Sequence, residues 1–290
     1  MMGWTGIIAA SALAWIASAA HAEDVTFNAT PYPIVTAEVN GKPARFQIDT
    51  TLPDVAVLNP AAAQRFGVRA IPAVGVQIGL DDAMIKGRIA RPRIVFANGA
   101  ATRSFVGLFG APYSAAENID GAIGPGVLPY DRIRFVLRDG AAGEHVHTIA
   151  LQGADKWDAP NTFAGVDAVL RLNLARRETV MSRPMTRVLS NASLLTPSGA
   201  LAPTLFPLGL TTAAQPAQTS QTIAGFALGP TLVRTDAPLV APDGVDMVTV
   251  VAHARKKPDY NVTLGRAALA GCSDIVWDRA ARRLTLHCDN

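Results

Sequence analysis

The sequence predicts an all-β protein with few short helices, built from two halves that repeat one order of elements. Runs that alternate apolar and polar residues recur along the chain, and a period of two is typical of half-buried strands. Asn40-Gly41 and Asn98-Gly99 follow such runs, and Asn-Gly is the strongest short signal of a β-hairpin. From Val166 onward the order strand, polar strand end, strand and helix returns.

The first half opens with a hairpin that ends in an acid. Residues 34–39 and 44–48 alternate on either side of Asn40-Gly41, and the second run leads into Asp49-Thr50-Thr51. The hairpin therefore places Asp49 at a strand end. The elements that we expect next are a strand over 55–58, a short helix over 61–66, strands over 86–97 and 104–109, a glycine turn over 124–128 and a strand over 132–137.

This order of elements resembles one lobe of a retropepsin-like (pepsin-fold) aspartic protease. The resemblance is carried by the hairpin, by Asp49-Thr50, by the apolar strand and short helix after them, and by the apolar run ending in Gly124. It implies that Asp49 is a catalytic acid and that Thr50 supplies a hydroxyl that braces the strand ends of two lobes. The family has glycine at the third position of the triplet, whereas this chain has Thr51.

The same pattern is expected a second time, in a more degenerate form. Residues 166–173 align with the strand that ends at Asp49, and residues 179–189 with the strand and helix after it. Gly265 precedes a leucine by four residues, as Gly124 does. The resemblance thus implies two retropepsin-like β-barrel lobes related by a pseudo-two-fold axis. The alternative is one such lobe followed by an unrelated all-β domain.

The two-lobe interpretation predicts how the chain is divided into parts. Extra length in the second half falls around Ser190–Thr222, where prolines and the run Thr211–Gln221 predict a long mobile loop. A flap of the pepsin fold would fall within Gly75–Arg88. The parts that we expect are a signal peptide (1–22), a first lobe (23–138), a connector (139–165) and a second lobe (166–290).

Catalysis in this family needs one carboxylate from each lobe. The two acids face a shared water and hold one proton between them, so that one acts as a base while the other polarises the substrate carbonyl. The partner position of Asp49 falls on Asn173, and an amide can neither donate a transferable proton nor act as a base. We therefore expect aspartic-type endopeptidase activity to be weak or lost, as in a pseudoenzyme.

Two further positions depart from the family pattern. Glycine at the third position lets the strand-end loops approach each other, whereas Thr51 and Ala175 carry side chains there. The residue that matches Thr50 is Leu174, so the hydroxyl brace is expected to be absent or one-sided. Without the resemblance, the simplest role of Asp49 is structural, as a strand-end acid that caps the next turn.

The N-terminus has the composition of a secretory signal. Residues 6–20 are apolar apart from small polar residues, and Ala20-His21-Ala22 is a small-x-small cleavage pattern, although the segment before the apolar run lacks Lys and Arg. The expected location is periplasmic or secreted, with no membrane span once the signal is removed. The alternative is an uncleaved anchor, for which the apolar run is short.

Cysteine and histidine positions bear on disulfides and metals. Cys272 and Cys288 flank an expected hairpin, which in an exported chain predicts a disulfide; two free thiols are the alternative. His145 and His147 share one face of a strand, a spacing that suits a metal, but the sequence offers no third ligand beside them. We expect no metal and no cofactor.

Composition argues against nucleic acid as a partner. The chain is 49% hydrophobic and 17% charged with a net charge of +3, and its basic residues are scattered. The resemblance implies a polypeptide substrate or peptide ligand. Three hypotheses stay open: a monomeric, degenerate protease whose cleft binds extended polypeptide, an active endopeptidase that pairs two copies of Asp49 in a homodimer, and a non-catalytic envelope module.

Overall fold

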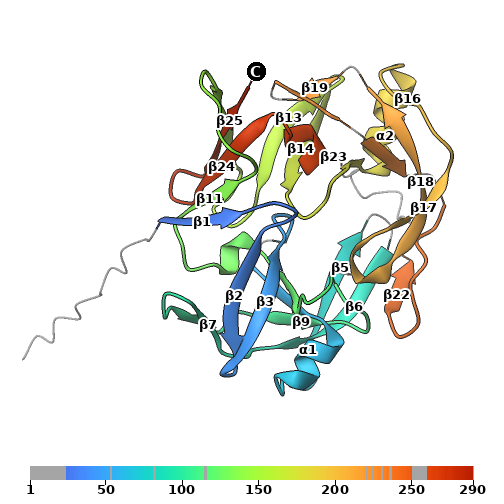
Figure 1. Cartoon of the computed structure of the whole chain (residues 1–290). Coiled ribbons are helices and arrows are strands. Elements are labelled where there is room, and N and C mark those ends of the chain that lie inside the picture. The colour runs from blue at the N-terminus through green and yellow to red at the C-terminus, as the bar shows by residue number, and fades with distance from the viewer. Residues whose placement is uncertain are drawn as a thin grey trace, which may run out of the picture.

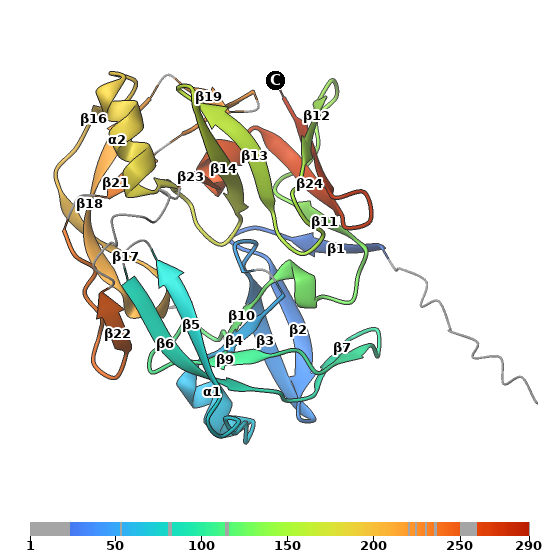
Figure 2. The ribbon, with the colours of Figure 1, turned by 180° about the vertical axis from the view of Figure 1, so that it is seen from behind.

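The computed structural model describes residues 24–52, 54–80, 83–113, 116–219, 221–223, 225–229, 231–234, 237–249 and 260–289. Two β lobes are joined by a sheet to which both contribute (Figures 1 and 2). This architecture confirms the predicted all-β, two-lobe fold. The expected signal peptide (1–22) lies outside the described residues. Within them, no helix is both long and apolar enough to cross a membrane.

The first lobe is one curled sheet, whose described strands follow the order β22-β6-β9-β4-β10-β3-β2-β7-β8, with β5 beside β6. One strand, β22, comes from the second half of the chain. The elements are β2 (Ile34–Val39), β3 (Lys42–Ile48), β4 (Ala56–Leu58), α1 (Pro60–Arg65), β5 (Gly75–Leu80), β6 (Ala83–Ala90), β7 (Ile94–Phe96), β8 (Ala101–Thr102), β9 (Val106–Leu108), β10 (Gly121–Ile123), η1 (Pro125–Val127) and β22 (Asp246–Thr249).

The second lobe is a sheet of order β13-β14-β23-β15-β21-β18-β16 among its described strands, with β17 beside β18. A small pair, β19 with β20, lies outside it. The elements are β13 (Asp158–Phe163), β14 (Val166–Asn173), β15 (Thr179–Met181), α2 (Arg183–Asn191), β16 (Thr196–Pro197), β17 (Ala202–Leu205), η2 (Pro207–Gly209), β18 (Thr211–Gln218), β19 (Thr222–Ile223), β20 (Phe226–Ala227), β21 (Thr231–Arg234), β23 (Asn261–Gly265) and η3 (Arg266–Leu269).

The two lobes repeat one topology. In the first, β3 lies antiparallel to β2 and parallel to β10, β4 lies antiparallel to β10 and parallel to β9, and β6 lies antiparallel to β9 and β5. In the second, the same pairings with the same directions join β14 to β13 and β23, β15 to β23 and β21, and β18 to β21 and β17. This repetition excludes the alternative of an unrelated second domain.

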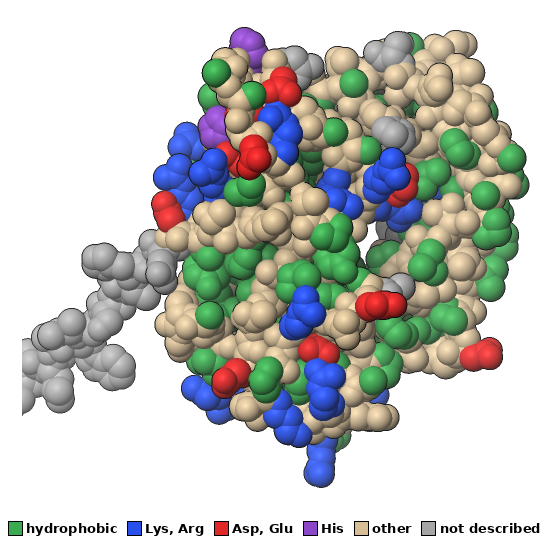
Figure 3. Space-filling model, in the orientation of Figure 1, with side chains coloured by type: hydrophobic (Ala, Val, Ile, Leu, Met, Phe, Trp, Pro, Cys, Tyr) green, Lys and Arg blue, Asp and Glu red, His purple; other side chains and the backbone are tan. Residues whose placement is uncertain are grey.

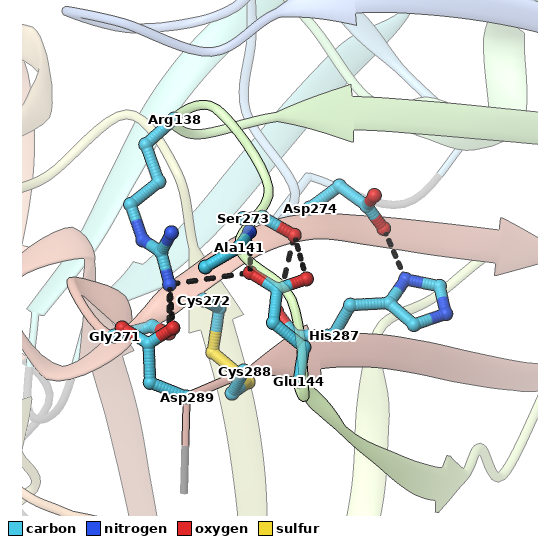
Figure 4. Close-up of a disulfide and its surroundings, with 10 residues drawn as sticks. All are labelled: Arg138, Ala141, Glu144, Gly271, Cys272, Ser273, Asp274, His287, Cys288 and Asp289. Carbon is cyan, nitrogen blue, oxygen red and sulfur yellow. Dashed lines mark hydrogen bonds and ion pairs between the residues drawn. A yellow bond between two sulfur atoms is a disulfide. The ribbon is translucent and has the colours of Figure 1, made fainter.

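A third sheet, of order β1-β11-β24-β25-β12, joins the halves. Its strands are β1 (Asp24–Asn28), β11 (Arg132–Val136), β12 (His145–Ala150), β24 (Cys272–Asp278) and β25 (Arg283–Cys288). The predicted hairpin β24–β25 is closed by the Cys272–Cys288 disulfide. Arg138 lies beside the disulfide and makes ion pairs with Glu144 and Asp289 (Figure 4). These pairs tie the loop before β12 to the residue that follows β25.

The structure differs from the sequence prediction in two segments. The range Ser190–Thr222 is not a long loop, because it contains β16, β17 and β18. Three residues of β18 are buried, namely Thr212, Ala214 and Ala217. The strand was missed because alanine has a low strand propensity and because prolines, which are rare inside strands, lie nearby. The range expected to be a connector, 139–165, contains β13, which pairs with β14 as β2 pairs with β3.

Candidate functional site

The polar ends of β3 and β14 are equivalent positions in the two lobes. In the first lobe, the last residue of β3, Ile48, pairs with Ile123, which directly precedes Gly124. In the second lobe, Leu172 of β14 pairs with Leu264, which directly precedes Gly265. Asp49 therefore corresponds to Asn173. Both side chains line one cavity of about 480 Å³. The structure thus brings together the two residues that the sequence matched.

Asp49 and Asn173 end their strands with the same local turn. Oδ1 of Asp49 accepts a hydrogen bond from the backbone N of Thr51 at 2.9 Å, and Oδ1 of Asn173 accepts one from the backbone N of Ala175 at 2.8 Å. Each side chain satisfies a backbone donor two residues later, which is the behaviour of Asp and Asn in turns. The capping role and the position beside the cavity therefore coexist.

The Asp49 side chain is buried, and its carboxylate accepts hydrogen bonds from residues of its own lobe. Its exposed fraction is 4%. Besides the backbone contact, Oδ1 accepts a hydrogen bond from Oγ1 of Thr51 at 2.6 Å, and Oδ2 accepts one from the Tyr113 hydroxyl at 3.1 Å. A water or substrate atom bound to this carboxylate must share an oxygen with Tyr113 or Thr51.

The hydroxyl brace between the lobes is one-sided. Oγ1 of Thr50 donates a hydrogen bond to the carbonyl oxygen of Leu172, across the interface between the lobes. Leu174, the residue that matches Thr50, is fully buried and has no hydroxyl to return the contact. Gly265 is packed tightly against the turn after β14, since a Cβ there would lie 2.3 Å from two carbonyl oxygens.

Tyr113 is positioned by Asn59, and neither residue was identified from the sequence. Oδ1 of Asn59 accepts a hydrogen bond from the backbone N of Tyr113 at 2.8 Å, and its Nδ2 donates to the carbonyl of Ile119 at 2.9 Å. The side chain therefore ties both ends of one loop to the start of α1. Nothing local in the sequence marks this loop contact.

We expect Asn59→Ala to lower the free energy of unfolding by roughly 2 kcal/mol, because it leaves buried backbone groups of the Tyr113 loop without partners. The matched control is Asn98→Ala, which removes an amide from an exposed turn where Oδ1 accepts from Ala100 N at 3.1 Å. Urea unfolding of both variants checks the expectation. Equal, small losses would show that the loop does not depend on Asn59.

Burial raises the pKa of Tyr113 well above its ordinary value of 10, and the negative charge of Asp49 and the hydrogen bond to it act in the same direction. A hydrogen bond with Thr51 opposes this shift. The hydroxyl therefore keeps its proton and remains a donor to Asp49 at any physiological pH.

This pKa shift predicts alkaline destabilisation. Above about pH 10 an unfolded tyrosine releases its proton, whereas folded Tyr113 keeps it, so the unfolded state binds fewer protons and stability falls as pH rises. We expect the free energy of unfolding to fall less steeply between pH 9 and pH 11 in Tyr113→Phe than in the wild type. Tyr32→Phe, at another cavity tyrosine, is the control. Equal slopes for Tyr113→Phe and the wild type would refute this origin.

A second cavity, of about 250 Å³, adjoins the first. The two share a wall whose members are Tyr113, Asn173, Arg176, Phe206 and Pro207. We call the cavity that contains Asp49 the outer cavity and the second one the inner cavity. The wall is held across the lobes, because the backbone N of Leu208 donates to the carbonyl of Tyr113 at 3.3 Å. The space between the lobes is therefore divided.

The β5–β6 hairpin flanks the inner cavity. Ile78 and Gly79 of β5 and Ile85 of β6 line it, and this hairpin occupies the range expected for a flap. On the side away from β5, β6 pairs with β22 from the second half of the chain, with Asp246 opposite Lys86. The hairpin is thus tied to both halves of the chain.

Phe206 lies between two arginines of the second lobe. The guanidinium of Arg176 lies 4.7 Å from the centroid of the Phe206 ring, and that of Arg234 lies 5.1 Å from it. Both line the inner cavity, as does Arg171. Nothing local in the sequence links Arg176 to Arg234.

The described residues contain no cluster of three or more His, Cys, Asp or Glu suited to a metal ion. The ring of His147, one member of the pair considered as a metal site, packs 4.9 Å from that of Phe226. Besides Asp49, Glu178 is the acid among the described residues that line the outer cavity, and its carboxylate lies 3.8 Å from Nε of Arg176. The matched strand ends thus hold one acid, Asp49, and one amide, Asn173.

The chain has a solved structural neighbour. It is similar to an aspartic proteinase from Irpex lacteus, with 10% sequence identity, a TM-score of 0.45, and coverage of 88% of this chain and 94% of that one. This likeness concerns the fold alone and assigns no role to any residue. No protein-family model and no curated protein sequence matches the chain.

Proposed function

We propose that the protein binds polypeptide between its two lobes and hydrolyses it weakly or not at all. The observation that carries the proposal is the pairing of Asp49 with Asn173 at equivalent strand ends beside one cavity. A peptidase of this type needs two carboxylates that share a proton, and loss of one general acid–base partner costs a rate factor of roughly 10²–10⁴.

The hairpin β5–β6 offers a route for binding. Within the described strands, β5 pairs with β6 alone, and Ile78 and Gly79 of β5 line the inner cavity. An extended peptide can add to such an edge through backbone hydrogen bonds, with alternate side chains entering a pocket. Both lobes belong to one chain, so a second copy with another Asp49 is not needed to build the walls of the site.

A second candidate is an interaction module without any catalysis. One observation favours it: an apolar cluster from both lobes, which includes Phe109, Tyr113, Phe206 and Leu208, packs across the interface. A substrate that spans the whole interface would have to displace this apolar cluster, whereas a ligand that enters one cavity would not.

Peptide binding tests the proposal. Fluorescence anisotropy with a mixed set of labelled 10- to 12-residue peptides would measure affinity, and mass spectrometry would measure cleavage. Gly79→Phe adds a side chain at the edge that lines the inner cavity, where a Cβ would contact only the Met84 side chain at 3.4 Å. Gly153→Phe is the matched control, since a Cβ there has nothing within 4 Å.

We expect Gly79→Phe to weaken binding at least tenfold and Gly153→Phe to leave it unchanged. Absence of binding by the wild type, or equal binding by the two variants, would refute a peptide site at this hairpin. Efficient cleavage by the wild type that Asp49→Ala abolishes would instead support the active endopeptidase.

A further inference from the structure

We propose that the inner cavity recognises a carboxylate of the bound polypeptide through Arg176 and Arg234; this inference rests on the proposed function. The two arginines come from distant parts of the second lobe, Arg176 from the turn after β14 and Arg234 from the end of β21. Phe206 holds them on one wall of the cavity.

The guanidinium groups are buried more deeply than solvated surface charges. Arg234 is 4% exposed, and the side chain of Arg176 is 18% exposed. Nε of Arg176 is inaccessible to solvent and has no hydrogen-bond acceptor among the described residues. A buried donor that lacks a hydrogen-bond partner is costly to the fold, and Oε2 of Glu178, at 3.8 Å, is beyond hydrogen-bond distance. A ligand acceptor would reach the guanidinium through the exposed part of the Arg176 side chain.

The charge around the inner cavity favours an anion. None of its described lining residues is Asp or Glu. Arg171 is paired with Asp158, with Nε and Oδ1 2.8 Å apart, and Arg176 and Arg234 are the other two guanidinium groups of the described lining. Glu178 offsets part of the charge of Arg176 from the side of the outer cavity. Figure 3 shows Lys and Arg side chains, with Asp or Glu side chains beside them, at the edge of a hollow between the lobes.

The electrostatic state of Arg176 is consistent with an anion site. Burial lowers the pKa of Arg176, Glu178 opposes this effect and the nearby charge of Arg234 adds to it. A bound carboxylate would relieve the repulsion between the two guanidinium groups. Guanidinium is also well suited to carboxylates, because its planar donors can form paired, charge-assisted hydrogen bonds.

The size of the cavity limits the ligand. About 250 Å³ holds one side chain or one chain end rather than a long segment. A peptide that pairs with β5 would bring its residues past Gly79 into this space. The carboxylate can belong to the C-terminus of the peptide or to an Asp or Glu side chain, and the two sources can be separated by experiment.

The test uses one peptide sequence in four forms: with a free or an amidated C-terminus, and with Glu or Gln at its centre. Isothermal titration of the full chain measures each affinity. N-acetylglycine and N-acetylglycinamide, followed by NMR, provide a pair of probes that need no peptide groove. The variants are Arg176→Gln and the conservative Arg176→Lys. Arg91→Gln is the control, because it removes an arginine that also stacks on a phenylalanine, at 5.5 Å from Phe105, outside both cavities.

We expect a carboxylate-bearing form to bind roughly 10- to 100-fold more tightly than its neutral counterpart, the range for hydrogen bonds to a charged group. Arg176→Gln should abolish this preference while the neutral forms bind as before, Arg176→Lys should keep part of it, and Arg91→Gln should keep it all. If Arg176→Gln does not fold, the Arg176→Lys variant and the wild-type comparison decide.

The outcomes separate this inference from the proposed function. Equal binding of all four peptide forms would overturn the carboxylate site and leave peptide binding intact. Binding of N-acetylglycine but of no peptide, with loss in Arg176→Gln, would support the carboxylate site and contradict the peptide cleft. A preference that persists in Arg176→Gln would overturn the assignment to this cavity.

Discussion

Asn173→Asp is expected to raise peptide hydrolysis about 10²-fold above the wild type, the lower end of the range for restoring a general acid–base partner. The new carboxylate would stand at the position equivalent to Asp49, beside the same cavity. Two carboxylates that face one water share one proton, which supplies the acid and the base together. The rate is measured with a fluorogenic peptide from pH 3 to pH 8.

The control for this gain is Asn261→Asp, because Asn261 also lines the inner cavity but does not lie at a matched strand end. Adding Asp49→Ala to Asn173→Asp should return the rate to background. No gain over Asn261→Asp would show that more than the missing acid prevents hydrolysis. Thr51 is the first candidate for that obstacle, since its hydroxyl already binds Asp49 at 2.6 Å.

The second large effect concerns stability at the junction of the two halves. Trp157 is 1% exposed, and its ring lies 5.4 Å from that of Phe135 in β11 and 6.3 Å from that of Trp277 in β24. The three rings join the first half, the segment between the lobes and the second half. Trp157→Ala should lower the free energy of unfolding by about 3–5 kcal/mol, through lost burial and the cavity left behind.

Guanidinium unfolding followed by circular dichroism measures this loss, and hydrogen exchange shows where it falls. Amides of both lobes should lose protection, because the cluster belongs to the sheet that joins them. Trp157→Phe should cost less, and Phe105→Ala, at a side chain 50% exposed, less still. Loss of protection in only one lobe would contradict a shared junction.

The features predicted from the sequence are those with a local signal. The Asn40-Gly41 turn has positive φ at both residues, 52° and 77°, as a type I′ turn requires. The same hairpin logic identified Asp49, and the matching strand, helix and glycine turn identified Asn173. The disulfide followed from two cysteines at the ends of one hairpin.

The features that were missed depend on contacts between distant segments. Tyr113 reaches Asp49 only because Asn59 holds its loop. Arg176 and Arg234 become neighbours only through Phe206. Periodicity carries no information about such contacts, and the same limit explains why β22 was not expected beside β6.

The alignment of the halves succeeded for a different reason. Parallel pairing of β3 with β10 and of β14 with β23 requires an apolar strand followed by a glycine turn in each lobe. Those requirements remain visible in the sequence even though the strand ends carry different residues, Asp49 in one lobe and Asn173 in the other.

The most direct test is a crystal structure of the protein with a peptide chosen from the binding experiments. We expect the peptide to pair with β5, to place a carboxylate within hydrogen-bond distance of Arg176, and to approach Asp49 and Asn173 without being cleaved. A peptide bound outside the two cavities, or cavities left unchanged at saturating peptide, would contradict a polypeptide site between the lobes.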